Sequence, residues 1–215
     1  MKTLDDLMFE TSHTDKSYRT RVKNSISPTR QEQITGRLIT HSYSNFYGPI
    51  LNSKRNTVAN FLEIGVWRGG SLTGWANYFD NANVYGIDNV NMFDINNHDG
   101  VHDISLPENA TFICDDAYNS VVLEKHFSNI KFDVIIDDGP HTKESQLFTL
   151  NFFHNKMRKN GVIFIEDVGS WEPHESVCKY IYENFEGDKN CLSLIDRTRN
   201  PFHGWNEYIL MYYIE

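Results

Sequence analysis

Two apolar runs of this chain end in acidic residues, and this pairing constrains the fold more than any other feature. The runs are FDVIIDDGPH (132–141) and GVIFIED (161–167). Continuous apolar runs of this kind are typical of strands that are buried on both faces of a parallel sheet. Because open parallel sheets bind ligands outside the carboxyl ends of their strands, a functional site is expected at this edge. Its candidate residues are Asp137, Asp138, His141, Glu166 and Asp167.

Short β-rich runs alternate along the chain with longer mixed segments, which is the pattern of βαβ units stacked into a parallel sheet. The last two strands are only about ten residues apart, too close for a crossover helix, so they should form an antiparallel hairpin. The expected strands are 60–65, 83–88, 110–115, 132–137, 161–167, 191–196 and 207–215. The expected helices are 71–79, 120–126, 143–157 and 173–185, and residues 89–109 read as an irregular polar insertion.

The size of the chain favours one domain with an N-terminal extension. It has 215 residues, of which 40% are hydrophobic and 13% aromatic, enough for one well-packed core. We assign residues 1–58 to an extension or substrate lid and residues 59–215 to a single α/β domain.

Charge and cysteine content exclude several classes of partner and site. A net charge of -9 and a pI of about 5.4 give no general attraction for nucleic acid or anionic membrane. The cysteines at 114, 178 and 191 are odd in number and lack C-x-x-C spacing, so neither a disulfide framework nor a zinc site is indicated. No apolar run approaches the roughly 18 residues that a spanning helix needs. We therefore expect a cytoplasmic protein without nucleic-acid or membrane partners.

A glycine-rich turn follows the first strand. Gly65, Gly69 and Gly70 precede a helix expected from Ser71, so backbone can approach a ligand closely and helix N–H groups can point at it. A tight turn without any ligand is the alternative interpretation. The spacing Gly65-x-x-x-Gly69 differs from the G-x-G-x-x-G fingerprint, which argues against a nicotinamide dinucleotide.

Two acids accompany this turn. Asp88 ends the second expected strand, where an acid can accept hydrogen bonds from ribose hydroxyls. Glu63 lies at the end of the first strand, where a ligand with an amino group would need a carboxylate. Together with the turn, these acids predict a nucleotide-like cofactor beside the acidic edge.

Four motifs resemble those of class I S-adenosylmethionine-dependent methyltransferases. In chain order they are LEIGVWRGGSL, YGID, ICDDA and VIIDD, within residues 60–170. The resemblance implies a Rossmann-like sheet of seven strands with an antiparallel C-terminal hairpin and helices on both faces. It also implies that the turn from Glu63 through Ser71 would hold the methionine part of the cofactor and Asp88 its ribose. The adenine edge would lie against Asp115, Asp116 and Ala117.

The DDGPH and ED motifs narrow the resemblance to metal-dependent macrolide-sugar O-methyltransferases and their cephalosporin-hydroxylase-like relatives. The segments HTDKS (13–17) and HSYSNFYGPIL (41–51) also resemble the leading part of that group. The resemblance implies that Asp138, Glu166 and Asp167 bind a metal and that His141 is the catalytic base. Related enzymes leave open a homo-oligomer built partly from N-terminal segments.

The chemistry of these residues agrees with that assignment. Three carboxylates form a hard oxygen site suited to Mg²⁺, or to Mn²⁺ as a substitute. Such a metal can hold adjacent hydroxyls of a sugar and acidify one of them. A neutral His141 could then take the proton. Asp137 could orient the loop or lie close to the cofactor.

The predicted function is therefore Mg²⁺-assisted methylation of a hydroxyl on a carbohydrate-like small molecule. One alternative acceptor is a catechol-like phenol, although catechol enzymes usually show an Asp-Asn pair where this chain has Glu166-Asp167. A cofactor-binding scaffold without turnover is another alternative. A metal-dependent phosphoester hydrolase would leave Glu63, Asp88 and Asp115 unexplained. Individually, the acids could also be helix caps or solvated loop residues.

Overall fold

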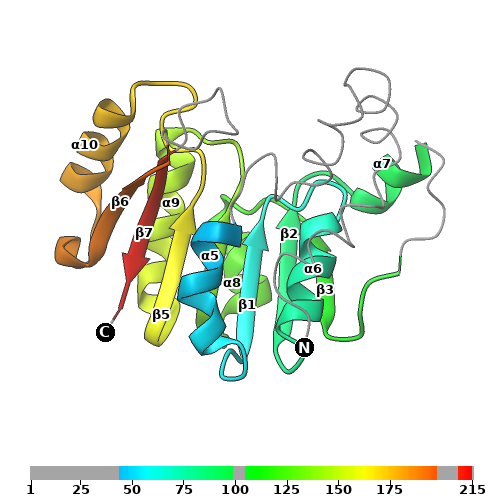
Figure 1. The fold of residues 1–215 in the computed structure, drawn as a ribbon. Coiled ribbons are helices and arrows are strands. Elements are labelled where there is room, and N and C mark those ends of the chain that lie inside the picture. The colour runs from blue at the N-terminus through cyan, green and yellow to red at the C-terminus, as the bar shows by residue number, and fades with distance from the viewer. Residues whose placement is uncertain (1–43, 99–104, 198–207, 215) are drawn as a thin grey trace, which may run out of the picture.

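A seven-stranded sheet forms the centre of the protein. The computed structural model describes residues 44–98, 105–197 and 208–214. The strand order is β3-β2-β1-β4-β5-β7-β6 (Figure 1). The strands are β1 Asn60–Ile64, β2 Asn83–Asp88, β3 Ala110–Cys114, β4 Phe132–Asp137, β5 Met157–Ile165, β6 Leu192–Asp196 and β7 Tyr208–Tyr213. β1 to β5 pair in parallel, whereas β7 runs antiparallel to β5 and β6. This confirms the predicted mostly parallel sheet with an antiparallel C-terminal hairpin.

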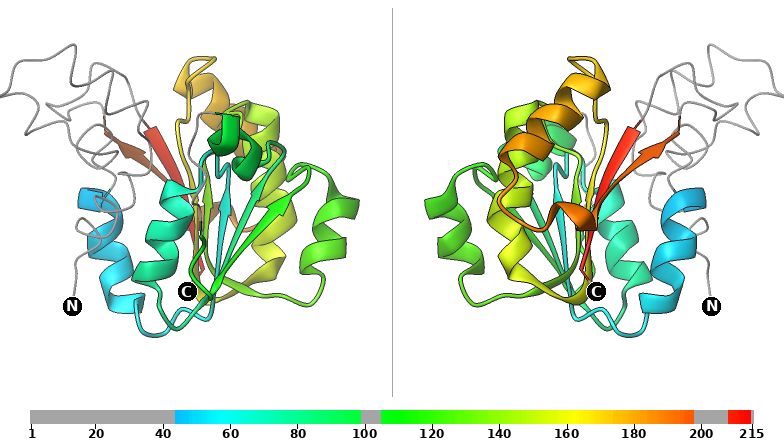
Figure 2. Two further views of the ribbon diagram at one scale, coloured as in Figure 1. Left: turned by 90° about the vertical axis from the view of Figure 1, so that its right-hand side faces the viewer. Right: turned by 90° about the vertical axis from the view of Figure 1, so that its left-hand side faces the viewer.

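Helices cover both faces of the sheet, as predicted. α5 and α6 lie on one face and α8 and α9 on the other, with α10 beside α9 (Figure 2). The helices are α5 Ser44–Leu51, α6 Gly70–Tyr78, α7 Met92–His98, α8 Ser120–Phe127, α9 Lys143–Phe153 and α10 His174–Asn184. Short 3-10 turns lie at Asn52–Lys54, His154–Lys156 and Lys189–Cys191. None of the helices in the described ranges is long and apolar enough to cross a membrane.

The alternation of side chains along the strands explains why their sequences are continuously apolar. Phe61 and Val134 pack in the core on the side of α5 and α6. Their neighbours Leu62 and Ile135 pack in the second core, under α8 and α9. Successive residues of a strand point to opposite faces, so a strand covered on both faces needs apolar residues at every position.

Helix α7 corrects the prediction that residues 89–109 are irregular. The Asn91 side chain accepts a hydrogen bond from the Phe93 amide at 3.0 Å, at the start of the helix. The Asn96 side chain donates to the Arg68 carbonyl at 3.0 Å and fixes the helix over the glycine-rich turn. A helix of 7 residues is too short to be stable alone. The contact between Asn96 and Arg68 joins the helix to a distant part of the chain and adds stability, and no local periodicity could reveal it.

The boundary between the third expected helix, 143–157, and the next strand also differs from the prediction. α9 ends at Phe153, and a 3-10 turn follows it, so the helix does not reach residue 157. β5 begins at Met157 and pairs with Phe132, before an irregularity in register that separates this pair from the rest of the ladder. The local irregularity explains why the apolar pattern alone placed the strand start at Gly161.

Helix α5 packs into the same core as the sheet. Tyr47 and Leu51 are buried there, beside Trp75 of α6. Residues 44–58 therefore contact the domain that was expected to start at residue 59. The HTDKS motif lies outside the described residues, and the role of residues 1–58 as an extension or lid stays a prediction.

Candidate active site

A cavity of about 520 Å³ lies at the carboxyl ends of β1 to β5. Segments that follow five different strands meet in it, as expected for a parallel sheet. They contribute Ile64, Gly65 and Trp67 after β1, Ile87 to Val90 at β2, Asp116 to Tyr118 after β3, Asp138 to His141 after β4, and Asp167 after β5. The glycine turn and the acidic edge that the sequence predicted thus belong to one cavity.

Gly65 is required by the close approach of two loops. Its φ is 85°, and a Cβ added there would lie 2.2 Å from the Asp138 carbonyl oxygen. Gly69 has a φ of 81° at the start of α6. Only glycine adopts such angles without a steric cost. The turn therefore brings the end of β1 directly against the DDGPH loop.

We expect Gly65→Ala to destabilise the protein by more than about 1 kcal/mol, because alanine fits neither the positive φ nor the space beside Asp138. Gly48→Ala in α5 is the matched control, since the nearest heavy atom would lie 4.0 Å away. That substitution should be neutral or stabilising by up to about 1 kcal/mol. Urea unfolding of the two variants checks both results. Equal stability of the two variants would contradict the strain at Gly65.

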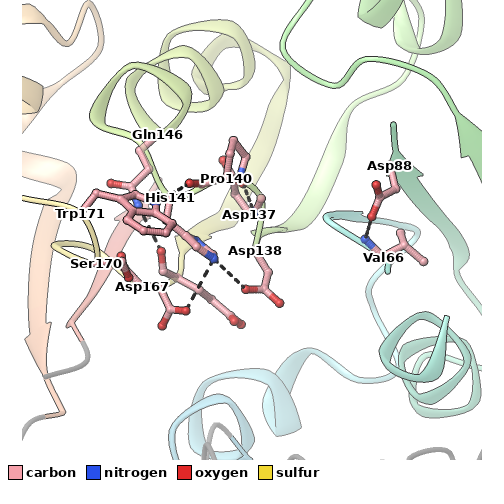
Figure 3. Close-up of polar contacts among 12 residues, drawn as sticks. Val66, Asp88, Asp137, Asp138, Pro140, His141, Gln146, Asp167, Ser170 and Trp171 are labelled. Atoms are coloured by element: carbon pink, nitrogen blue, oxygen red, sulfur yellow. Dashed lines mark hydrogen bonds and ion pairs between the residues drawn. The ribbon is translucent and has the colours of Figure 1, made fainter. Parts of the chain in front are cut away.

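Asp88 ties the glycine turn to the end of β2. Its Oδ2 accepts a hydrogen bond from the Val66 amide at 2.9 Å (Figure 3) and another from the Trp67 amide at 2.8 Å. Its Oδ1 accepts from the Val90 amide at 2.9 Å. The carboxylate also lines the cavity. Asp88 thus holds the turn in shape at the position predicted for a ribose contact.

Other predicted cofactor residues are divided between the cavity and its surroundings. Asp116 and Ala117 line the cavity. Asp115 does not; its Oδ2 lies 3.1 Å from His126 and 3.5 Å from Lys125 on α8. The hydrogen bond with His126 is the main reason why the pKa of Asp115 is lowered.

The remaining predicted cofactor residues are next to the glycine turn or part of it, and they do not line the cavity. Glu63 is 2% exposed within β1, one residue before the lining begins. Gly70 and Ser71 form the first turn of α6. The buried Ser71 Oγ has no hydrogen-bond partner among the described residues. A hydroxyl in that position is suited to a polar ligand at the start of the helix.

Asp137 is a structural carboxyl behind the cavity wall. It is buried and accepts hydrogen bonds from Thr149 Oγ1 at 2.5 Å, the Tyr118 hydroxyl at 2.7 Å and the Gly139 amide at 3.0 Å. Burial raises the pKa of Asp137, while the hydrogen bonds from Thr149 and Tyr118 act against the rise. Of the two roles left open by the sequence, this geometry favours orientation of the loop. It also positions Tyr118, a cavity residue that the sequence analysis did not identify.

Three predicted catalytic and metal residues meet at one end of the cavity. His141 Nε2 lies 3.9 Å from Asp138 Oδ1 and 3.7 Å from Asp167 Oδ2 (Figure 3). One ligand atom from each residue lies within 4.8 Å of the others. The fourth predicted member, Glu166, is outside this group; its carboxylate accepts a hydrogen bond from the Tyr47 hydroxyl. The structure thus gathers two of the three predicted acids around the predicted base.

Backbone strain is concentrated at the same cavity. Trp67, His141 and Asp167 have φ angles of 52°, 59° and 54°, and all three line it. Positive φ in residues other than glycine costs about 1–3 kcal/mol and occurs preferentially at functional sites. Trp171 braces the loop, because its indole nitrogen donates to the Pro140 carbonyl at 2.8 Å (Figure 3). The strained loops are therefore held by specific contacts.

Comparison with known proteins agrees with this geometry. Residues 62–168 match the family described as a methyltransferase domain. The chain is therefore similar to a methyltransferase domain over just under half of its length. It is 26% identical over 152 residues to demethylmacrocin O-methyltransferase from Streptomyces fradiae, covering 63% of this chain and 35% of the relative. The chain thus spans about a third of the length of this relative.

Solved methyltransferase structures share the fold. The mycinamycin-pathway methyltransferase MycE, in complex with Mg and SAH, has a TM-score of 0.57 at 20% identity, covering 95% of this chain and 55% of MycE. The O-methyltransferase from Bacillus cereus, in complex with SAH, has a TM-score of 0.61 at 14% identity, covering 97% of this chain and 90% of that protein. The methyltransferase domain therefore has the Rossmann-like fold that the motifs implied.

Proposed function

We propose that the protein is an S-adenosylmethionine-dependent, Mg²⁺-assisted O-methyltransferase that acts on a hydroxyl of a sugar or glycosylated small molecule. The observation that carries this proposal is the single cavity shared by Asp88, the glycine turn and the cluster of Asp138, His141 and Asp167. Methyl transfer needs a donor and an activated hydroxyl within reach of each other. We call the side of the cavity with the glycine turn and Asp88 the cofactor wall, and the group of Asp138, His141 and Asp167 the acid cluster. A donor at the cofactor wall and a hydroxyl at the acid cluster would lie in the same cavity.

The cofactor wall would hold S-adenosylmethionine through the parts predicted from the sequence. The turn after β1 offers backbone amides and the first turn of α6 for the methionine part. Asp88 would accept hydrogen bonds from the ribose hydroxyls, and Asp116 with Ala117 would border the adenine. When bound, S-adenosylmethionine supplies a methyl group on a positively charged sulfur.

The acid cluster has the chemistry of a hard-cation site. Asp138 and Asp167 offer carboxylate oxygens, which Mg²⁺ prefers, and His141 lies between them. The related MycE was solved with Mg, and the resemblance adds Glu166 to the ligands. When bound, the cation supplies positive charge that lowers the pKa of a hydroxyl of the acceptor.

His141 has the position of the general base in this proposal. Its Nε2 faces the two carboxylates, and the residue lines the cavity. With S-adenosylmethionine bound, His141 would take the proton that the acceptor hydroxyl releases when its oxygen receives the methyl group. The loop geometry set by Asp137 keeps the base at this place.

Calorimetric titration of S-adenosylmethionine and S-adenosylhomocysteine, with and without Mg²⁺, tests the cofactor site. We expect Asp88→Ala to weaken binding by about 10- to 100-fold, the equivalent of lost hydrogen bonds to a charged group. Asp133→Ala is the matched control. Asp133 Oδ2 likewise accepts two amide hydrogen bonds, from Ala59 at 2.8 Å and Asn60 at 3.0 Å, but at the opposite edge of the sheet. Undetectable binding to the wild type would overturn the proposed function.

An acceptor screen then separates the hydroxyl classes. Sugars and glycosylated compounds should be methylated in a Mg²⁺-dependent reaction, whereas methylation of catechols alone would replace the proposed acceptor with a phenol. Cofactor binding without turnover of either class would favour a scaffold.

A further inference from the structure

Tyr47 connects helix α5 to the acidic edge of the sheet. Its side chain is 2% exposed and packs against Phe164 of β5 and Trp75 of α6, with ring centroids 4.9 Å and 5.8 Å away. Its hydroxyl donates a hydrogen bond to Oε1 of Glu166, which follows β5 directly. Tyr47 lies outside the matched residues 62–168, yet it contacts an acid that precedes Asp167 of the acid cluster.

Glu166 is fixed from three sides. Its amide donates to the Asp137 carbonyl at 2.9 Å, at the end of β4. Its carbonyl accepts from Gln146 Nε2 of α9 at 3.2 Å. Tyr47 of α5 holds the carboxylate. Because the next residue is Asp167, with a strained φ of 54°, the restraints on Glu166 also limit where the cluster carboxylate of Asp167 can lie.

The chemistry of the contact suits a metal ligand. Glu166 is only 5% exposed, and a buried carboxylate needs hydrogen-bond donors. A phenol supplies one without a positive charge, whereas a lysine or arginine would compete electrostatically with a cation.

We propose that Tyr47 is a positioning residue of the metal site, which orients the Glu166 carboxylate and thereby raises the affinity for the divalent cation. The inference rests on the proposed function for the presence of the metal. Hydrogen-bond partners that orient metal ligands typically change metal affinity by about 10- to 100-fold. Through Tyr47, helix α5 would therefore contribute to metal binding.

Mn²⁺ binding followed by electron paramagnetic resonance tests this role, with S-adenosylhomocysteine affinity measured in parallel. We expect Tyr47→Phe to weaken Mn²⁺ binding by about 10- to 100-fold and to leave S-adenosylhomocysteine affinity unchanged. Tyr78→Phe is the matched control, because Tyr78 is equally buried beside Trp75 and its hydroxyl donates to Asn52 Oδ1 at 2.6 Å, away from the acids. The control should bind Mn²⁺ like the wild type.

A double-mutant cycle with Glu166→Gln separates positioning from a merely structural effect. If Tyr47 acts through Glu166, Tyr47→Phe will cause no further loss of Mn²⁺ affinity in the Glu166→Gln background. Equal Mn²⁺ affinity of the wild type and Tyr47→Phe would overturn the inference alone. Absence of Mn²⁺ binding to the wild type would overturn the proposed metal site as well. If Tyr47→Phe does not fold, fluorotyrosine at position 47 provides the readout. A fluorine chemical shift that does not change when Mg²⁺ is added would contradict the role.

Discussion

His141→Asn is expected to lower kcat for methyl transfer by about 10²- to 10⁴-fold, the usual contribution of a general base. Asparagine adopts positive φ readily, so the strained backbone at this position should be preserved. S-adenosylmethionine affinity should stay unchanged, because the cofactor wall is formed by other segments. Single-turnover kinetics with an acceptor from the screen, combined with calorimetry of the cofactor, measures both effects.

Two controls define what this result means. His154→Asn replaces a histidine whose Nδ1 contacts the carbonyls of Leu150 and Asn151 at the end of α9, and it should keep full activity. Mn²⁺ affinity of His141→Asn distinguishes a base from a metal ligand, since only a ligand would lose binding. Wild-type kcat in His141→Asn would refute its assignment as the base.

Asp167→Asn is expected to weaken Mn²⁺ binding more than 100-fold, beyond the roughly 10- to 100-fold effect of residues that only support a ligand. The substitution removes one negative charge from the cluster but keeps the side-chain shape, and asparagine tolerates the φ of 54°. Metal-dependent methyl transfer should be lost in parallel, while S-adenosylhomocysteine still binds. Mn²⁺ titration followed by electron paramagnetic resonance measures the affinity.

Asp116→Asn is the matched control for the metal prediction. Asp116 also lines the cavity, and its Oδ1 accepts a hydrogen bond from the Tyr118 amide at 2.9 Å, which an asparagine oxygen can accept too. It is not a member of the acid cluster. Mn²⁺ affinity should therefore be unchanged in this variant. Equal Mn²⁺ affinities of Asp167→Asn and Asp116→Asn would show that general negative charge, not the cluster, attracts the cation.

The sequence predicted the sheet and the edge at which the site lies because both depend on simple periodicities. Apolar residues at every position identified β4 and β5 as buried strands, and parallel strands bring their carboxyl ends together. The glycine turn was predictable for a local reason, since glycine adopts a φ of 85°, as at Gly65, without the steric cost that other residues incur.

The direction of individual acids was not predictable in the same way. In each acidic pair after β3, β4 and β5, the second residue lines the cavity and the first does not. The cavity members are Asp116, Asp138 and Asp167; their neighbours are Asp115, Asp137 and Glu166. Successive residues of an extended chain point to opposite sides. Which residue of a pair lines the cavity depends on where the strand ends, and sequence patterns locate that point poorly.

Contacts between distant segments were also hidden from the sequence. Tyr47 packs in the core of the domain, and its hydrogen bond to Glu166 joins residues 119 positions apart. Tyr118 likewise became visible as a site residue only in the structure, where it lines the cavity and contacts Asp137. Such pairs follow from the packing of helices on the sheet, which no local pattern encodes.

A nuclear magnetic resonance titration tests most directly whether the methyl donor and the cation occupy one cavity. S-adenosylmethionine with an isotope-labelled methyl group is bound to the protein, and Mn²⁺ is added to the wild type and to Asp167→Asn. The shared cavity predicts that the bound methyl resonance broadens strongly in the wild type and not in the variant, because paramagnetic broadening requires the ion to lie close to the methyl group. A methyl signal that binds the protein but stays sharp at saturating Mn²⁺ would contradict the proposed site.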